Sequence, residues 1–432
     1  MSAEPVGTGT SGRGGNLAVD PDRLWNSIAE TAQIGATAKG GICRLALTDL
    51  DRQVRDWFVA RCEAIGCRVT VDDMGNIFAR REGRNPALAP IAVGSHLDTQ
   101  PTGGKYDGII GVLAGLELLR TLHETGIKTE APIEVVNWSN EEGSRFAPAM
   151  LSSGVFAGAF SRAWACDRTD RGGERFGTAL EAIGYRGAEP CGQHPLSALF
   201  ELHIEQGPVL EAENKVIGIV TGVQGMRWYE VTVDGQEGHA GATPMRLRQD
   251  ALLTAAAMVR SVGDIAAAHA PDAVGTVGLI ECRPNSRNVV PGQVFFTVDL
   301  RHPSDAVLDE MEAAMRARFA EDARGLGFRV DDVWNKPAVR FDGECIAAVR
   351  EAAAGLGFPA REIISGAGHD AAYVAAVAPT TMIFVPCAGG LSHNEAESAE
   401  KDHVAAGANV LLRAVLDTDR RLAAARHGNL SP

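Results

Sequence analysis

Five side chains of the metal-ligand type lie in short Gly-rich or turn-like segments of this sequence. They are His96, Asp107, Glu142, His203 and His393. Most of these segments directly follow an apolar run, so the side chains would leave the ends of strands. Imidazole and carboxylate are the usual ligands of zinc-type sites. A carboxylate such as Asp107 can bridge two ions, and paired ions about 3.5–4 Å apart are a known hydrolytic device. The pattern therefore predicts a two-metal hydrolase.

The first segment, GSHLDTQPTGGKYDGIIG, contains both His96 and Asp107. We interpret His96 as a ligand and Asp98 as the group that fixes the other ring nitrogen of His96. Gly103 and Gly104 would let the backbone turn sharply beside a metal on Asp107. A surface histidine and a solvated Asp turn are the alternatives. The preceding strand end and the Gly-rich loop together favour the metal site.

Two adjacent carboxylates, Glu141 and Glu142, follow the apolar run IEVVNW. Neighbouring side chains at a strand end point in different directions, so one can bind metal while the other remains a general base. We predict Glu142 as the ligand and Glu141 as the base. A helix-start acidic pair favoured by the helix dipole is the alternative, and it would be the better interpretation of this pair in isolation.

The remaining candidates lie further along the chain. His203 and His393 also follow apolar runs, and Gln206 could point to the same site as His203. His239 lies in the Gly-rich turn GQEGHAGATPM. Arg301, at the end of VFFTVDLRHP, could clamp a substrate carboxylate in bidentate fashion, although a surface salt bridge is the alternative. No serine has a nucleophile-elbow setting, and no Walker loop or dinucleotide-binding pattern occurs.

Composition excludes several classes of function. The net charge of −14 disfavours nucleic acid or an anionic membrane as a partner. The eight cysteines form no C-x-x-C pair, which indicates reduced thiols in a cytoplasmic protein. We expect no apolar run long enough to span a bilayer. The Gly/Ser-rich residues 1–18 are predicted to be a disordered tail.

The elements that must position these residues alternate between strand and helix. Residues 19–224 and 338–432 therefore indicate an α/β catalytic domain with a mainly parallel sheet, whose ligands lie at the carboxyl ends of strands. Residues 225–337 indicate an inserted β-α-β-β-α-β unit of ferredoxin-like type. Its expected strands and helices are Trp228–Val233, Gln249–Ala267, Val274–Ile280, Gln293–Leu300, Ser304–Ala323 and Phe328–Val333. A final helix is expected over Ala399–Leu416.

The motifs as a set resemble those of the hydantoinase/carbamoylase family of di-zinc amidohydrolases, from about residue 22 to 420. They are the first segment quoted above, NEEGSRFAPAMLSSGVF, ELHIEQGP, GQEGHAGATPM, NVVPG, VDLRHP, SGAGHDA and LSHNEAE. That family includes N-carbamoyl-L-amino-acid hydrolases, β-ureidopropionases of the bacterial and yeast type, and allantoate amidohydrolases. The resemblance implies two divalent ions, zinc in the first place, with Mn, Co or Ni as alternatives.

The resemblance also implies a role for each matching residue. One ion would be held by His96, Asp107 and His203, and the other by Asp107, Glu142 and His393. Glu141 would be the general base, and Asp98 would be the partner that orients a metal ligand from behind. The substrate contacts would be Gln206, His239, Asn288, Arg301 and the Gly368 loop. A homodimer through the inserted lid domain and a cis peptide between Asp107 and Gly108 are further expectations.

The resemblance favours cleavage of the ureido C–N bond of an N-carbamoyl-L-amino acid or N-carbamoyl-β-alanine, giving the amino acid, ammonia and carbon dioxide. Allantoate hydrolysis is an alternative, although DTQPTGGKYDG is closer to the carbamoyl-amino-acid members. An aminoacylase or dipeptidase of the same clan is a second alternative. A non-catalytic binding relative is disfavoured, because such a chain would have no reason to keep the base and every ligand.

Overall fold

The computed structural model describes residues 17–428, so nearly all of the predicted tail, residues 1–18, lies outside the described residues. The chain divides into two compact units. The larger contains the chain up to Val220, Asp342–Glu362 and the chain from His369 onwards; the smaller contains Thr221–Phe341 and Ile363–Gly368. The sequence assigns the segment Ile363–Gly368 to the catalytic domain, whereas the structure groups it with the smaller unit. Hydrogen bonds to the Gly366 carbonyl from Gln224 and Arg301 explain the difference.

One large sheet runs through the larger unit. Its order is β1-β2-β4-β3-β5-β16-β6-β14, and β15 pairs with β6. The strands are β1 (Arg68–Val71), β2 (Ile77–Arg81), β3 (Ile91–His96), β4 (Ile133–Trp138), β5 (Ala198–Ile204), β6 (Ile217–Val223), β14 (Val339–Arg340), β15 (Ala360–Ser365) and β16 (Thr380–Val385). The central strands β4, β3, β5 and β16 are parallel, while β1, β2, β6 and β14 pair antiparallel.

The central parallel strands are buried along their whole length, which explains their nearly continuous apolar runs. A parallel connection needs a crossover, and the apolar helix α3 (Ile109–Glu124) supplies it between β3 and β4. Because these strands run in the same direction, their carboxyl ends lie at one edge of the sheet. Ligands bind at that edge in open α/β sheets.

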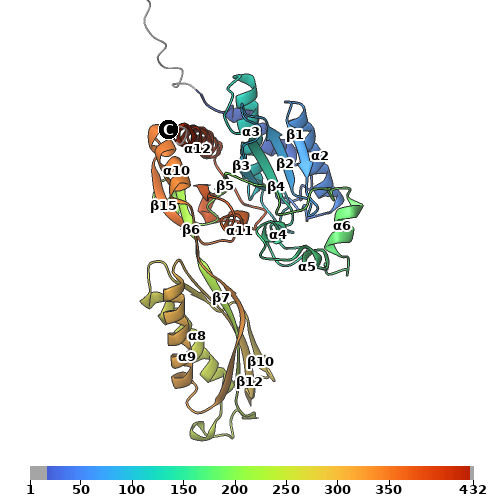
Figure 1. Ribbon diagram of the computed structural model, residues 1–432. Helices are drawn as coiled ribbons and strands as arrows, with labels where there is room; N and C mark the ends of the chain where they lie inside the picture. Colours follow the sequence, from blue (N-terminus) through green and yellow to red (C-terminus); the bar gives the residue numbers. More distant parts are fainter. Residues whose placement is uncertain (1–16, 429–432) are drawn as a thin grey trace, which may run out of the picture. The chain divides into compact units, whose positions relative to one another are not determined.

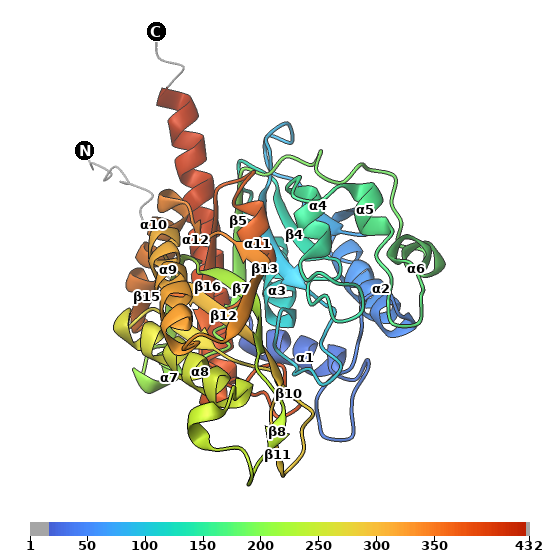
Figure 2. The ribbon, with the colours of Figure 1, turned by 90° about the horizontal axis from the view of Figure 1, so that it is seen from below.

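The first helix of the larger unit begins where its local sequence favours a helix start. The Asp20 side chain accepts hydrogen bonds from the N–H groups of Asp22 and Arg23, and Pro21 occupies the first helical turn of α1. Figure 2 shows the last helix, α12, alongside α10, and it extends to Gly428 rather than to the predicted Leu416. Besides α3, the helices of the larger unit are α1 (Pro21–Thr31), α2 (Asp49–Glu63), α4 (Leu151–Phe156), α5 (Arg162–Cys166), α6 (Phe176–Ala182), α7 (Val209–Ala212), α10 (Gly343–Gly355), α11 (Asp370–Val374), η2 (Ala388–Gly390) and α12 (Lys401–Gly428).

The smaller unit is a ferredoxin-like α+β unit, as predicted. Its antiparallel sheet has the order β10-β12-β7-β13, and β9 also pairs with β12. Helices α8 and α9 lie side by side over one face of this sheet, and Met258, Phe296 and Phe319 are among their shared core (Figure 1). The elements are β7 (Gly225–Asp234), β8 (Gly238–His239), η1 (Met245–Leu247), α8 (Ala251–Ala268), β9 (Val274–Thr276), β10 (Ile280–Arg283), β11 (Val289–Val290), β12 (Gln293–His302), α9 (Asp305–Asp322) and β13 (Gly327–Lys336).

Two expectations for this unit were wrong. The single strand predicted over Val274–Ile280 is divided into β9 and β10. Thr276 pairs with Asp299 and Ile280 with Phe296, so the β9–β10 segment has one residue more than β12 between these pairs, and the extra residue interrupts the strand. The second expectation was that no apolar run is long enough to span a bilayer. Within the described chain, α8 is long and apolar enough to do so, by length and composition alone. Its buried face packs into the core of this unit.

Candidate metal centre

The predicted metal ligands come from four neighbouring parallel strands and one helix start of the larger unit. His96 is the last residue of β3, and His203 lies near the end of β5. Glu142 follows β4, and His393 follows β16. Asp107 immediately precedes Gly108, the residue that begins α3. The carboxyl edge of the parallel sheet thus gathers residues that lie up to several hundred positions apart in sequence.

These ligands form two sets of three that share Asp107. His96, Asp107 and His203 form one set, and Asp107, Glu142 and His393 form the other; the ligand atoms within each set lie within 4.8 Å of one another. Asp107 Oδ1 is 3.1 Å from His203 Nε2, and its other oxygen, Oδ2, is 3.3 Å from His393 Nε2. His393 Nε2 is 3.4 Å from Glu142 Oε2. Tetrahedral zinc with bonds of about 2.0–2.2 Å separates its ligands by roughly 3.4 Å, so this donor set fits two divalent ions.

Hydrogen bonds set the tautomers of two histidines. His96 Nδ1 lies 2.9 Å from the Asp98 carbonyl oxygen, and His203 Nδ1 lies 2.8 Å from the Ile204 carbonyl oxygen. A carbonyl can only accept, so each Nδ1 carries a proton, and in the neutral ring each Nε2 has the lone pair that a metal would take; in His203 this nitrogen also lies 3.0 Å from the Gly108 N–H. This is the arrangement that a metal-binding imidazole requires.

Asp98 contacts His96 differently from the sequence interpretation. Its main-chain oxygen accepts the Nδ1 hydrogen bond, and its carboxylate Oδ1 is 3.9 Å from Nδ1. The carboxylate instead accepts the N–H groups of Glu141 and Glu142, both at 3.3 Å. Asp98 therefore connects the His96 strand end to the turn that carries the predicted base. The carboxylate was taken as the contact because the sequence cannot show which oxygen faces the ring.

The buried carboxylates of the cluster repel one another in the absence of a cation. Burial raises the pKa of Glu141 well above its usual range, and the charges of Asp370 and Glu142 raise it further. Burial and the charge of Asp107 likewise raise the pKa of Glu142. Burial raises the pKa of Asp98 to about 7. Divalent cations would relieve this repulsion, which is a second reason why these residues fit metal.

The histidines beside Asp107 differ in their protonation. Burial lowers the pKa of His96 to about 4, so its imidazole is neutral near pH 7. Burial also acts to lower the pKa of His203, but the contact with Asp107 outweighs it and raises the pKa to about 9. A proton and a metal ion would therefore compete for His203.

Several side chains at the cluster had no distinct sequence signal. Gln100 holds both oxygens of Glu142, through its main-chain N–H at 3.0 Å and its side-chain Nε2 at 2.6 Å. The Ser392 hydroxyl lies 3.1 Å from Asp107 Oδ2. Gln206, predicted as a substrate contact, directs Nε2 to the oxygens of Asp107 at 3.2 and 3.1 Å. Polar residues in loops are too common for the sequence to have singled out Gln100 or Ser392.

A third set of potential ligands, Glu201, His203 and His369, shares His203 with the first set. The Glu201 carboxylate already accepts hydrogen bonds from Ser95 Oγ at 2.6 Å and from the Ala371 N–H at 3.1 Å. These hydrogen bonds give Glu201 a structural role, in which it connects β3 to the start of α11. We therefore do not interpret it as a ligand of a third ion.

The other predicted substrate contacts, His239, Asn288, Arg301 and Gly368, belong to the smaller unit. His239 and Asn288 are brought together by the short β8–β11 pair, in which the Ala240 N–H donates to the Asn288 carbonyl at 2.9 Å. Arg301 donates Nη1 to the Gly366 carbonyl at 3.0 Å. The smaller unit therefore holds the predicted contacts in two groups. One contains His239 and Asn288, and the other contains Arg301 and the loop of Gly366 and Gly368.

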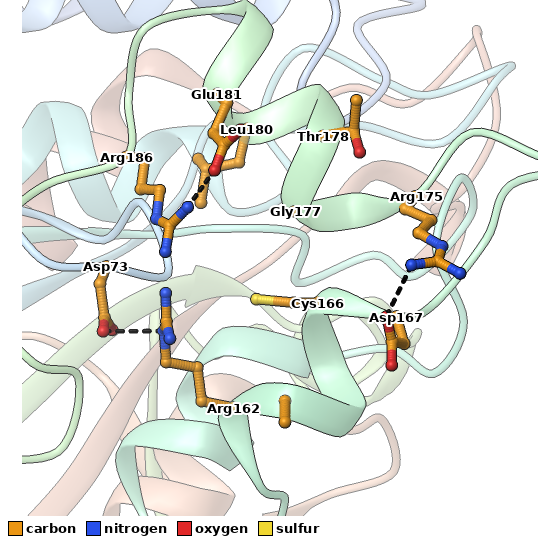
Figure 3. Close-up of a pocket in the computed structure, with 11 residues that line it drawn as sticks. Asp73, Arg162, Cys166, Asp167, Arg175, Gly177, Thr178, Leu180, Glu181 and Arg186 are labelled. Atoms are coloured by element: carbon orange, nitrogen blue, oxygen red, sulfur yellow. Dashed lines mark hydrogen bonds and ion pairs between the residues drawn. The ribbon is translucent and has the colours of Figure 1, made fainter.

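A surface pocket of about 240 Å³ shares no lining residue with the metal-ligand cluster. Figure 3 shows that its arginines each face a carboxylate: Arg162 faces Asp73 at 2.7 Å, Arg175 faces Asp167 at 3.4 Å, and Arg186 faces Glu181. The charges in this pocket are balanced within the chain. It has no role in the chemistry considered for the metal centre.

The cis peptide expected between Asp107 and Gly108 is not found. The cis peptide bonds of the described chain precede Pro148, Pro271 and Pro284. Gly108 turns the chain with a φ of +67°, a conformation open to glycine at little cost. The would-be Cβ of Gly108 lies 2.2 Å from His96 Nε2, so glycine is also needed for space.

Comparison with known proteins identifies the class to which this fold and site belong. Residues 92–417 match the family model described as peptidase family M20/M25/M40, and the chain belongs to this family. The chain is 50% identical over 407 residues to an N-carbamoyl-L-amino-acid amidohydrolase of Rhizobium meliloti, covering 94% of this chain and 98% of the relative. An allantoate amidohydrolase of Bacillus subtilis (strain 168) is 36% identical over 89% of this chain and 96% of its own.

A solved structure of similar fold comes from Burkholderia multivorans and is described as an amidase of the hydantoinase/carbamoylase family. It has a TM-score of 0.91 and 58% identity, covering 93% of this chain and 98% of its own. The resemblance stated from the motifs is confirmed, as are the α/β fold class and the enzyme class, a hydrolase of amide C–N bonds.

Proposed function

We propose that this protein hydrolyses the ureido C–N bond of an N-carbamoyl amino acid. The observation that carries the proposal is the pair of three-ligand sets sharing Asp107, with the Glu141 carboxylate 3.5 Å from His96 Nε2. The 50% identical relative, an N-carbamoyl-L-amino-acid amidohydrolase, supports this substrate class. The products would be the free amino acid, ammonia and carbon dioxide.

Two divalent ions would be held by His96, Asp107 and His203 and by Asp107, Glu142 and His393. When bound, such ions polarise a carbonyl and lower the pKa of water. Zinc suits this mixture of imidazole and carboxylate, and Mn, Co or Ni are alternatives that cellular supply would decide.

Glu141 would act as the general base. It leaves the same turn as Glu142 but belongs to neither set of three ligands. Its main-chain N–H is held by the Asp98 carboxylate at 3.3 Å, which fixes the turn. Glu141 would take the proton of the attacking water and return it to the leaving nitrogen, which a ureido group needs because its nitrogen is a poor leaving group.

His239 would donate a hydrogen bond to the carbonyl oxygen of the substrate. Its Nδ1 accepts the N–H groups of Gly241 and Ala242, both at 3.1 Å, so Nδ1 carries no proton. The proton of a neutral ring is then on Nε2, which faces away from the turn as a donor. Negative charge develops on the carbonyl oxygen in the transition state, and such a donor stabilises it.

Arg301 would bind the carboxylate of the substrate, assisted by Asn288. Asp299 accepts from Arg301 Nε and Nη2 at 3.0 and 2.8 Å, and the Gly366 carbonyl accepts from Nη1 at 3.0 Å. These bonds fix the plane of the guanidinium and use one N–H of each terminal nitrogen, so each has a second N–H for a substrate carboxylate. Gln206 and the Gly368 loop would complete the contacts.

The smaller unit would also serve as a lid and as the interface of a homodimer. Strands β9 and β10 at its sheet edge, with the segment between them, expose Val274, Leu279 and Ile280, and α8 exposes Leu253. Exposed apolar groups on an unpaired sheet edge are unusual unless another chain covers them. An Ile280→Lys variant should sediment as a monomer, and a dimer of unchanged stability in this variant would remove the edge from the interface.

We place the protein in the cytoplasm, with neither nucleic acid nor membrane as a partner. All eight cysteines are free thiols, several of them buried. The net charge of −14 opposes binding to phosphate-rich surfaces. A small anionic substrate is compatible with this charge because Arg301 acts locally.

Ammonia release by the metal-reconstituted protein tests the function. The substrates are N-carbamoyl-L-α-amino acids, N-carbamoyl-β-alanine and allantoate, with an N-acetyl amino acid as the control. We expect turnover of a carbamoyl amino acid, reduced by about 10²–10⁴-fold in Glu141→Gln with metal content unchanged. If only allantoate were hydrolysed, the protein would share the substrate of its Bacillus subtilis relative. If only the N-acetyl control were hydrolysed, the proposed carbamoyl substrate would be refuted.

A further inference from the structure

The buried carboxylate of Glu397 lies against the loop that carries Asp107, and nothing in the proposed reaction uses it. Glu397 is 5% exposed and follows His393 by four residues. Its Oε1 accepts the main-chain N–H groups of Tyr106 at 3.0 Å and Asp107 at 3.1 Å. Its Oε2 lies 3.0 Å from the Ser392 hydroxyl. One side chain thus contacts two loops that each carry a predicted ligand.

These contacts hold Asp107 at both ends. Glu397 accepts the main-chain N–H of Asp107 directly, and the Ser392 hydroxyl, which has one hydrogen to donate, lies between the two carboxylates, 3.1 Å from Asp107 Oδ2. Asp107 belongs to both sets of ligands. A small displacement of Asp107 would therefore disturb both ion sites, and Glu397 opposes it by holding the main chain of Asp107.

Gly104 gives this carboxylate its space. A Cβ at position 104 would lie 2.0 Å from Glu397 Oε1 and 2.2 Å from its Cδ. Such distances are far below van der Waals contact, so any larger residue would push the carboxylate away from the N–H groups it accepts. The glycine that the sequence suggested as a flexible turn is thus required by packing against Glu397.

The charge of Glu397 also matters. When ionised, the Glu397 carboxylate adds to the negative potential at Asp107, which costs free energy in the protein alone and favours cation binding. Burying a carboxylate without a partner charge costs free energy, which a cation bound at the neighbouring Asp107 would offset.

We propose that Glu397 is a positioning residue of the two-metal centre, which fixes Asp107 between the two ions and increases their affinity. The role assigned to Glu397 rests on the metal site of the proposed function. Glu397 contacts neither the substrate nor an ion in this scheme, and it acts through Asp107 and Ser392.

Glu397→Gln tests the proposal because it keeps the size and the accepting oxygen but removes the charge and the second acceptor. Glu395→Gln is the matched control: Glu395 lies in the same loop and pairs with the exposed Lys39 at 3.6 Å. Zinc and manganese affinities are measured by competition with a chelator. Thermal unfolding of each protein is measured with and without metal.

We expect Glu397→Gln to lower metal affinity by about 10–100-fold, the usual range for residues behind metal ligands, with Glu395→Gln unchanged. The unfolding temperature without metal should be no lower than in the wild type, while the increase produced by metal should shrink. Unchanged metal affinity, or an equal loss of stability with and without metal, would overturn the proposal.

Gly104→Ala provides an independent test should Glu397→Gln fold poorly. It displaces the carboxylate by contact without changing its chemistry and should weaken metal binding in the same way. Wild-type affinity in Gly104→Ala would overturn the proposal. Failure of the proposed function has a different signature, because the wild-type protein would then bind metal normally but release no ammonia from carbamoyl amino acids.

Discussion

Gly108→Ala should inactivate the metal centre far more than it destabilises the fold. Gly108 begins α3 with a φ of +67°, and Gly126 follows the end of the same helix with a φ of +66°. A Cβ at Gly126 meets nothing within 4 Å, whereas a Cβ at Gly108 lies 2.2 Å from His96 Nε2. Gly126→Ala therefore also places an alanine at positive φ at an end of α3, but without the collision.

The magnitude follows from these distances. An alanine at positive φ costs about 1–2 kcal/mol of unfolding free energy, which both variants should share. Moving from 2.2 Å to an ordinary contact of about 3.4 Å requires the His96 ring to shift by roughly 1.2 Å. A misplacement of about 1 Å in an active site can cost 10²-fold in rate, so kcat/KM should fall by at least about 10²-fold in Gly108→Ala alone.

The assay compares ammonia release, zinc content and urea unfolding for the two variants and the wild type. We expect similar unfolding free energies for the two variants, together with loss of zinc and activity in Gly108→Ala only. Equal activity in both variants would refute the argument that His96 occupies the space above Gly108. Equal inactivation of both would show that strain in α3, and not the His96 contact, controls the site.

Three further outcomes follow from the structure. Arg301→Lys should raise KM for carboxylate-bearing substrates about 10–100-fold with little change in kcat, because lysine lacks the planar guanidinium that Asp299 orients. An unchanged KM in initial-rate measurements would exclude Arg301 as the group that binds the substrate carboxylate. Chelation should lower the unfolding temperature, and metal at about 100 times its Kd should restore roughly 2.7 kcal/mol; a chelator-insensitive transition would contradict a resident metal. Burial acts to lower the pKa of His194, but the contact with Glu134 at 2.6 Å outweighs it and raises the pKa above its ordinary value. The stability that this pair contributes should be complete below about pH 6.5 and be lost as pH rises through the raised pKa. Urea unfolding of His194→Gln should therefore differ most from the wild type at about pH 6, and the difference should shrink as pH rises through the raised pKa.

The sequence alone determined much of the fold and of the metal centre. Buried parallel strands need continuous apolar runs, so β3, β4, β5 and β16 were recognisable, and each is followed by or ends in a candidate ligand. Asp20 and Pro21 favour a helix start from local sequence alone, because capping is a local interaction. Ligand types and their position at strand ends predicted a two-metal site on five residues, and the family resemblance implied the two sets that share Asp107.

The tertiary structure decided what depends on contacts between distant segments. The Asp98 carboxylate faces the Glu141 turn rather than the His96 ring, and Gln100 holds Glu142. Glu397 could not be distinguished from Glu395 in LSHNEAE, since only packing against the Gly104 loop separates a buried carboxylate from a partly exposed one. Local sequence fixes chain direction and hydrogen-bonding capacity, whereas the partner that each polar group meets depends on how loops far apart in sequence pack together.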